Sequence, residues 1–132
     1  MIDLQETARI KEAIESNPGD FEKIIEDTKL AICITDEDQN FAAVNDNYLK
    51  LYEFNREDLI GQSFLKVVPQ ETQGELSELH DKFIEIQIEM MRDWVVLSKT
   101  GKKMKISVDA GFSDQINDAP HKITFVQLEE YL

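Results

Sequence analysis

The sequence contains little of what several common classes of protein require. Its 132 residues include one cysteine, Cys33, and two histidines, which excludes an internal disulfide and a CxxC metal or haem-attachment motif. No apolar run approaches the ~18 residues that span a bilayer, and the N-terminus lacks the basic start and apolar centre of a signal peptide. We therefore expect a cytoplasmic protein that does not associate with a membrane.

Positive charge is also scarce, with 14 Lys and Arg against 27 Asp and Glu and a net charge of −13. Because nucleic acids and anionic membranes both bind clustered positive charge, neither is an expected partner. The acidic excess lies within residues 1–91, since residues 92–132 carry 6 basic and 6 acidic side chains. This asymmetry predicts an acidic helical side and a balanced sheet side, where we expect partner contact.

Catalytic motifs are missing as well. The sequence has no Gly-rich phosphate loop and no Ser or Cys nucleophile in a recognisable elbow. His121 follows Pro120 at the start of an expected strand and is interpreted as a surface residue. We therefore expect no enzymatic activity.

The first pattern that the sequence does contain predicts an amphipathic helix over residues 3–16. Asp3 can cap its N-terminus, and Asn17-Pro18-Gly19 ends it. A second short helix is expected from Phe21 to about Lys29. The apolar residues of the first helix share one side of a helical wheel: Ile2, Ile10, Ala13 and Ile14.

The rest of the chain alternates between strand and helix patterns. Apolar or alternating runs predict five strands, over Ala31–Thr35, Phe41–Val44, Trp94–Leu97, Met104–Phe112 and Ile123–Leu128. Helical patterns cover Asp46–Glu53, Arg56–Leu59 and residues 71–90. This order predicts an α+β protein with an antiparallel sheet and helices over one face.

Ordered motifs make this chain similar to the PAS domain family. The similarity is clearest from Ala31 to Val68 and continues through the later strands, and its motifs are Thr35-Asp36, Val44-Asn45, Leu59-Ile60-Gly61, Phe64-Leu65, Pro69 and Lys99-Thr100-Gly101. The resemblance implies a five-stranded antiparallel sheet and a ligand between that sheet and the 71–90 helix. It divides the chain into an N-terminal cap or dimerisation helix, residues 1–19, and a PAS domain, residues 20–132.

The resemblance extends to haem-binding members in part. His80 opens a His-Asp-x-aromatic-Ile pattern that includes Phe83, and in such proteins this His is the iron ligand. Arg92 stands nine residues before Gly101, where those proteins place an oxygen-binding Arg, and Met90 stands two residues earlier. The segment from His80 to Arg92 is shorter than in those proteins, so a haem-based gas sensor is an alternative reading.

Flavin is the other cofactor that the family implies. Trp94 lies near the start of the third strand, as in some flavin-binding members, but closer to the hairpin. Cys33 lies on the first strand, away from the position of a photoreactive thiol. The cofactor thus stays open between haem, flavin, another small ligand and none, and a ligand-free scaffold for protein contacts is a further alternative.

The expected function is that of a sensory module that binds a small ligand and mediates dimerisation or partner contact. Candidate ligand-binding residues are His80, Phe83, Met90, Arg92 and Trp94. We expect a homodimer through the apolar side of the N-terminal helix. The resemblance also implies a signalling partner or an output domain, and the chain is either a stand-alone protein or a sensor domain of a longer one.

Overall fold

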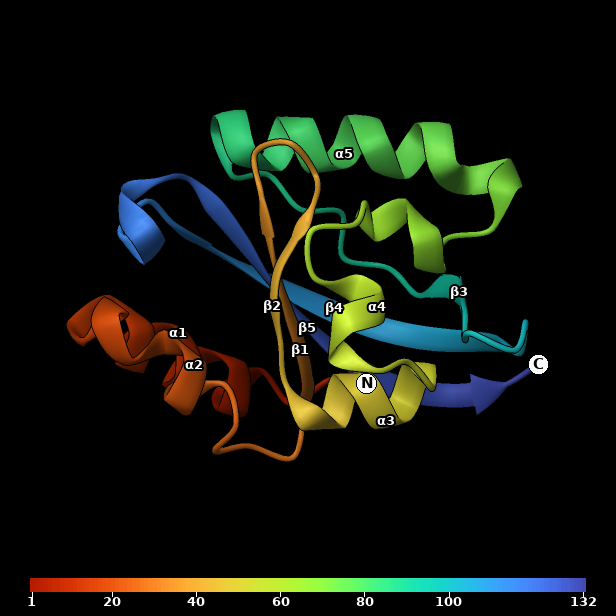
Figure 1. The fold of residues 1–132 in the computed structure, drawn as a ribbon, viewed down its shortest axis with the longest axis horizontal. Coiled ribbons are helices and arrows are strands. Elements are labelled where there is room, and N and C mark those ends of the chain that lie inside the picture. The colour runs from red at the N-terminus through yellow and green to blue at the C-terminus, as the bar shows by residue number, and fades with distance from the viewer.

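The computed structural model describes all residues from Met1 to Leu132. Five antiparallel strands form one sheet in the order β2-β1-β5-β4-β3 (Figure 1). The strands are β1 (Ala31–Asp36), β2 (Phe41–Val44), β3 (Trp94–Leu97), β4 (Lys103–Ser113) and β5 (His121–Tyr131). The five-stranded antiparallel sheet expected from the sequence is thus confirmed.

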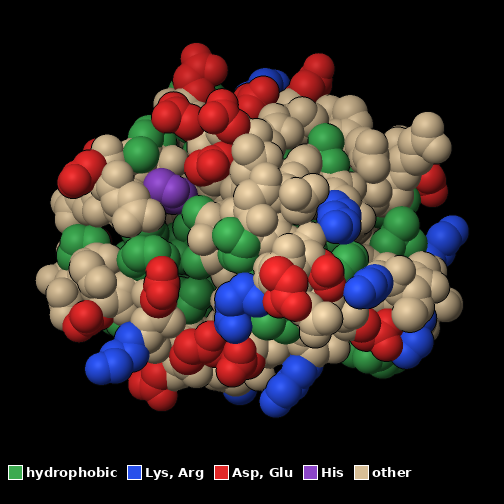
Figure 2. All heavy atoms as spheres, in the orientation of Figure 1, with side chains coloured by type: hydrophobic (Ala, Val, Ile, Leu, Met, Phe, Trp, Pro, Cys, Tyr) green, Lys and Arg blue, Asp and Glu red, His purple; other side chains and the backbone are tan.

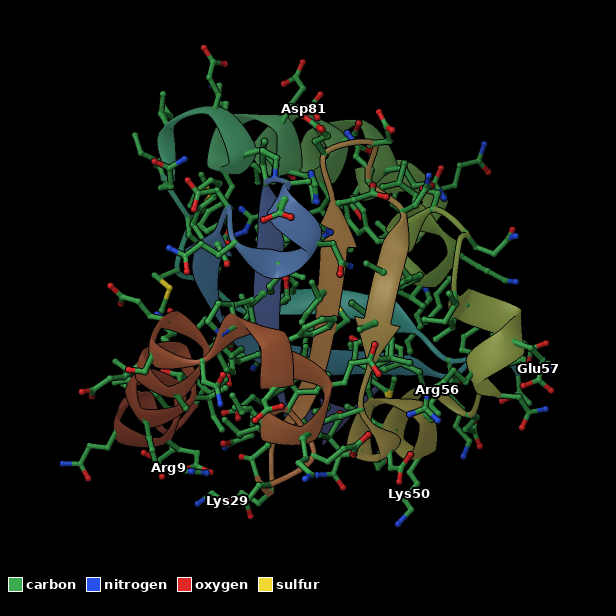
Figure 3. The ribbon with its side chains drawn as sticks, turned by 60° about the vertical axis from the view of Figure 1, so that its left-hand side comes forward. Arg9, Lys29, Lys50, Arg56, Glu57 and Asp81 are labelled. Carbon is green, nitrogen blue, oxygen red and sulfur yellow. The ribbon has the colours of Figure 1, made fainter.

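Helices cover the sheet from both sides. The five α-helices are α1 (Leu4–Ser16), α2 (Phe21–Ile24), α3 (Asp46–Tyr52), α4 (Arg56–Leu59) and α5 (Gln73–Ile86). Helices α3, α4 and α5 belong to one face, and α1 and α2 belong to the other. Figure 3 shows α5, which carries the labelled Asp81, at the end of the molecule opposite to the labelled Arg9 and Lys29. None of these helices is both long and apolar enough to cross a membrane.

The central strand β1 shows why its sequence is a continuous apolar run. Ala31 and Cys33 face the core under α3 and α5, whereas Ile32 and Ile34 face the core under α1 and α2. A strand that is buried on both faces cannot alternate polar and apolar residues. Two cores therefore share this strand, and also β5, which pairs with it from Ala31 to Asp36.

Asn45 joins the two cores through four hydrogen bonds. Its side-chain oxygen accepts from the backbone N–H of Ile32 at 2.9 Å and of Tyr48 at 2.9 Å. Its amide nitrogen donates to the carbonyls of Ile25 at 2.7 Å and Leu30 at 2.9 Å. The side chain is fully buried, so it caps α3 and also fixes the chain that enters β1.

The N-terminal helix packs on its own sheet. Asp3 accepts hydrogen bonds from the N–H groups of Gln5 and Glu6, which confirms it as the N-cap. Ile10 and Ile14 are 0% and 1% exposed. The helix is therefore part of the core that covers one sheet face.

This packing involves the residues expected at a dimer interface. Ile2, Ile10 and Ile14 are buried within the chain, and Ala13 is half-buried. In this conformation their apolar side chains contact the sheet and are not free for a second copy. A homodimer, if it forms through this region, needs other residues.

Several expected boundaries differ from the structure. The helix expected over residues 71–90 ends at Ile86, because Gln87 adopts a left-handed conformation with φ of 57°. Its side-chain amide donates to the carbonyls of Phe83 and Ile84, which satisfies the helix end. Residues 87–93 then form no helix or strand. The helix expected from Phe21 to Lys29 is also shorter and ends at Ile24.

The surface has an acidic side. Figure 2 shows acidic side chains gathered over α5, at the top of the view. On this helix Glu75, Glu78 and Asp81 are exposed, while His80 and Phe83 turn toward the core. The opposite sheet face is partly covered by α1 and α2, so less of it is open to a partner than the sequence suggested.

Candidate functional site

A cavity of about 90 Å³ lies between the sheet and α5. Most of its wall is apolar, which suits the hydrocarbon part of a ligand. The apolar and aromatic lining residues are Cys33, Tyr48, Tyr52, Phe64, Val67, Val68, Leu76, Leu79, Trp94, Val96, Ile106, Val108 and Val126. The remaining lining residues are polar: Thr35, His80, Glu89, Lys122 and Thr124.

His80 carries the most informative polar group in this wall. The side chain is 3% exposed, and its ring stacks on Phe64 with the centroids 5.1 Å apart. Nε2 lies 2.8 Å from the Thr35 hydroxyl, whereas the buried Nδ1 has no hydrogen-bond partner. Buried polar groups are rarely left unpaired, so this Nδ1 is an exception in a residue that lines the cavity.

The environment of His80 keeps the ring neutral. Burial lowers its pKa to about 4, and the positive charge of Lys122 acts in the same direction. The carboxylates of Asp81 and Asp36 oppose this shift. Near neutral pH the imidazole therefore has one N–H and one bare nitrogen, and the proton can sit on either nitrogen.

A buried ion pair forms another polar part of the cavity wall. Lys122 Nζ lies 2.6 Å from Glu89 Oε2, with side chains only 11% and 14% exposed. Lys122 comes from the cavity side of β5, and its ammonium also lies 4.9 Å from the centroid of the Phe83 ring. Glu89 comes from residues 87–93, the segment without helix or strand.

Two tyrosines and the cysteine form another part of the wall. The rings of Tyr48 and Tyr52 stack with centroids 4.2 Å apart. Burial raises the pKa of Cys33 to about 11 and raises the pKa of both tyrosines well above the usual value. These groups are therefore neutral at physiological pH, and Cys33 is a protonated thiol in an apolar wall.

The structure brings only some of the sequence-predicted residues to the cavity. His80 and Trp94 line it. Phe83 is buried beside the cavity, and its ring lies 6.5 Å from that of Phe112. Met90 and Arg92 are exposed and are not part of the lining, and the Arg92 guanidinium lies 3.8 Å above the outer side of the Trp94 ring system.

Lys122 and Glu89 were not among the residues predicted from the sequence. The signal for Lys122 was the alternation along β5, which places Lys122, Thr124 and Val126 on one face and Ile123 and Phe125 on the other. No comparable signal existed for Glu89, because it continues the acidic spacing of α5 beyond the point where that helix ends.

The site does not fit haem or flavin in this conformation. A cavity of about 90 Å³ is well below the ~300–1,000 Å³ of pockets for drug-sized ligands, and both cofactors are at least that large. The expected haem contacts also diverge, because Arg92 and Met90 lie outside while His80 lies within. The cavity instead suits a molecule of a few heavy atoms, because its volume of about 90 Å³ equals that of roughly three liquid water molecules at ~30 Å³ each.

The buried neutral state of His80 predicts a pH-dependent stability. Between about pH 6.5 and pH 4 the unfolded chain binds a proton at His80 that the folded chain does not. The free energy of unfolding should therefore fall on acidification, with His80 contributing up to about 3 kcal/mol. Urea denaturation at several pH values should show a correspondingly smaller fall in His80→Gln.

His121→Gln is the matched control, because it removes the other histidine, whose Nδ1 is hydrogen-bonded to the carbonyl oxygen of Ala119 at 2.8 Å. This residue is 4% exposed rather than superficial as the sequence suggested. An equal fall in wild type and His80→Gln would show that His80 is not held neutral by the fold.

Comparison with known proteins gives one family and many similar folds. A family model described as PAS fold matches residues 19–110. Comparison with curated proteins finds no matching sequence.

Solved structures share the architecture at low sequence identity. A PAS domain from Desulfitobacterium hafniense aligns with a TM-score of 0.72 and 12% identity, over 81% of this chain and 99% of that one. A domain of a sensory box sensor histidine kinase/response regulator from Geobacter sulfurreducens gives 0.69 and 11%, over 88% and 96%. The PAS-B domain of Drosophila melanogaster Cycle with bound ethylene glycol gives 0.64 and 12%, over 75% and 99%.

Proposed function

This chain belongs to the PAS family, and we propose that it is a sensory module whose cavity between the sheet and α5 binds a small ligand. The observation that carries the proposal is a mostly apolar cavity of about 90 Å³ whose lining residues include His80, a buried side chain with an unpaired Nδ1. An apolar enclosure with one free polar contact can hold and orient a small molecule. The proposal includes no catalytic step.

The size of the cavity supports a ligand much smaller than the common cofactors. Among similar folds, the Cycle PAS-B domain has been crystallised with ethylene glycol, a molecule of this size class. Such a ligand is favoured over haem and flavin, because a cavity of about 90 Å³ holds only a few heavy atoms.

Strand β5 offers a route from the cavity to the other side of the sheet. Lys122, Thr124 and Val126 line the cavity, while Ile123 and Phe125 alternate with them and form part of the core under α1. The Lys11 ammonium of α1 lies 5.9 Å from the centroid of the Phe125 ring. A ligand that shifts β5 therefore also changes how α1 packs on the sheet. Through α1, it changes the contact with a partner protein or output domain.

The homodimer remains a prediction, and α1 offers different residues for it than those first expected. Met1 and Leu4 are 88% and 47% exposed, whereas Ile10 and Ile14 are buried. A second copy would therefore meet the solvent side of α1 and the chain start. We propose a cytoplasmic setting for this signalling role.

The test uses Trp94, the only tryptophan in the chain and a residue of the cavity wall. Native mass spectrometry of the purified protein should show whether a small molecule accompanies it. Titration with propionate, propionamide and 1-propanol should change the Trp94 fluorescence for at least one of them.

Val108→Phe is the variant that fills the cavity, and Val95→Phe is its matched control. Val108 lines the cavity, whereas Val95 is 36% exposed on β3 and is not a lining residue. Binding should be lost in Val108→Phe and kept in Val95→Phe. If no small molecule accompanies the protein and none of the three compounds binds, the chain is a ligand-free interaction scaffold instead.

A further inference from the structure

We propose that the ligand of this cavity is a short-chain carboxylate, which pairs with Lys122 in exchange for Glu89. The inference rests on the proposed ligand-binding function and adds the chemical class of the ligand. Its basis is the arrangement of Lys122, Glu89 and His80 around one small apolar cavity.

Lys122 requires an anion at this place. Its side chain is 11% exposed, and a buried ammonium without a partner is strongly unfavourable. Glu89 is the one carboxylate within salt-bridge distance of it. Whatever replaces Glu89 beside Lys122 must therefore also carry negative charge.

The two members of the pair are held very differently. Lys122 belongs to β5, which pairs with β1 and β4 on both sides. Glu89 belongs to residues 87–93, which lie outside any helix or strand. Besides the ion pair, its carboxylate accepts one hydrogen bond, from the backbone N–H of Met90 at 3.2 Å. Its neighbours Ile88 and Met90 are 61% and 43% exposed. Glu89 is thus the partner that can leave.

The exchange conserves charge inside the protein. A ligand carboxylate enters beside Lys122, and the Glu89 carboxylate moves into water, so one buried anion replaces another. This avoids the large penalty of leaving Lys122 unpaired. When the cavity is empty, the Glu89 carboxylate thus occupies the place beside Lys122 that the ligand carboxylate takes on binding.

His80 supplies a second contact for the same ligand. When the Thr35 hydroxyl donates to Nε2, the imidazole proton sits on Nδ1, which then is a donor without a partner in the chain. A carboxylate has two oxygens and can accept from an ammonium and from an N–H at once. The remaining charged groups that act on His80, Asp36 and Asp81, repel an anion, and Lys122 opposes them.

The apolar wall sets the rest of the ligand. Trp94, Val96 and Ile106 are among the apolar lining residues, and about 90 Å³ corresponds to the volume of roughly three liquid water molecules. A short alkyl chain with one carboxylate meets both requirements. Its binding would free residues 87–93, which lead directly into Trp94 at the start of β3.

The experiment compares propionate with its neutral isostere propionamide, using Trp94 fluorescence on the full chain. Propionate should bind roughly tenfold more tightly, as expected for a hydrogen-bonded charge pair. Lys122→Met should reduce propionate affinity to that of the amide, roughly tenfold weaker. Glu89→Gln should raise propionate affinity at least about threefold, because it removes the internal competitor.

The double variant Lys122→Met/Glu89→Gln keeps the test valid if Lys122→Met alone unfolds, because it removes both charges of the pair. It too should bind propionate and propionamide equally, with circular dichroism confirming the fold. Equal binding of both compounds by the wild type, or unchanged propionate affinity in Lys122→Met or Glu89→Gln, overturns the carboxylate inference and leaves the ligand-binding function intact. Binding of none of the compounds overturns both.

Discussion

Asn45→Asp is expected to lower the free energy of unfolding by at least about 3 kcal/mol. The change keeps the shape of the side chain and the oxygen that accepts from Ile32 and Tyr48. It removes the amide that donates to the carbonyls of Ile25 and Leu30. A carboxylate oxygen would then face two carbonyl oxygens in a fully buried place, where repulsion is not screened.

Asn47→Asp is the matched control, because it is the same change two residues along α3. Asn47 is half-buried, and its amide donates to the carbonyls of Thr28 at 2.8 Å and Leu30 at 3.2 Å. We expect a loss of about 1 kcal/mol, since water can replace these bonds. Guanidinium chloride denaturation followed by circular dichroism measures both, and equal losses would contradict the central role given to Asn45.

Ile10→Asp is the second large change and should cost at least about 4 kcal/mol of unfolding free energy. Ile10 is 0% exposed and belongs to the core formed by α1, α2, β1 and β5. The substitution loses the buried side chain and places a charge without a partner against Ile32 and Phe125. Ile10→Ala gives a milder version of about 2–4 kcal/mol if the charged variant fails to fold.

Ala8→Asp provides the comparison on the solvent side of the same helix, where Ala8 is exposed. It should cost only about 0.5 kcal/mol through helix propensity. Analytical ultracentrifugation of both variants adds the oligomeric state. Should Ile10→Asp match Ala8→Asp in stability while dissociating a dimer, Ile10 would contact a second chain rather than its own sheet.

Asn45→Asp and Ile10→Asp both test the sheet strands that are buried on two faces. β1 and β5 are buried on both faces, so the cavity side and the α1 side of the sheet are coupled through the same strands. Asn45 fixes the chain at one end of β1, and Ile10 covers the opposite face. A sensory module needs such a sheet to convert a change in a cavity into a change on the other surface.

Local patterns predicted most elements of this fold because each depends on neighbouring residues. Asp3 caps α1, as expected from its residue type and position. Alternation along residues 104–112 placed Met104, Ile106 and Val108 on the buried face of β4. The boundary at Ile86 was missed because a left-handed Gln87 inside an acidic helical pattern has no distinctive local signal.

The site was predicted only in part. His80 was selected through its His-Asp-x-aromatic-Ile pattern, and the structure shows it buried. Arg92 and Met90 were selected by resemblance and lie outside the cavity. The Lys122–Glu89 pair joins residues 33 positions apart, and such a contact leaves no trace in the periodicity of either segment.

By itself, the sequence determined the fold class, most strands and helices and the N-cap of α1, because these follow from periodicity and side-chain chemistry within a few residues. Only the tertiary structure decided that α1 buries its apolar side against its own sheet and that the cavity is small. It also decided that Lys122 and Glu89 meet beside that cavity. The reason is physical: enclosed volume and buried ion pairing depend on how distant segments pack, and packing is a property of the whole chain.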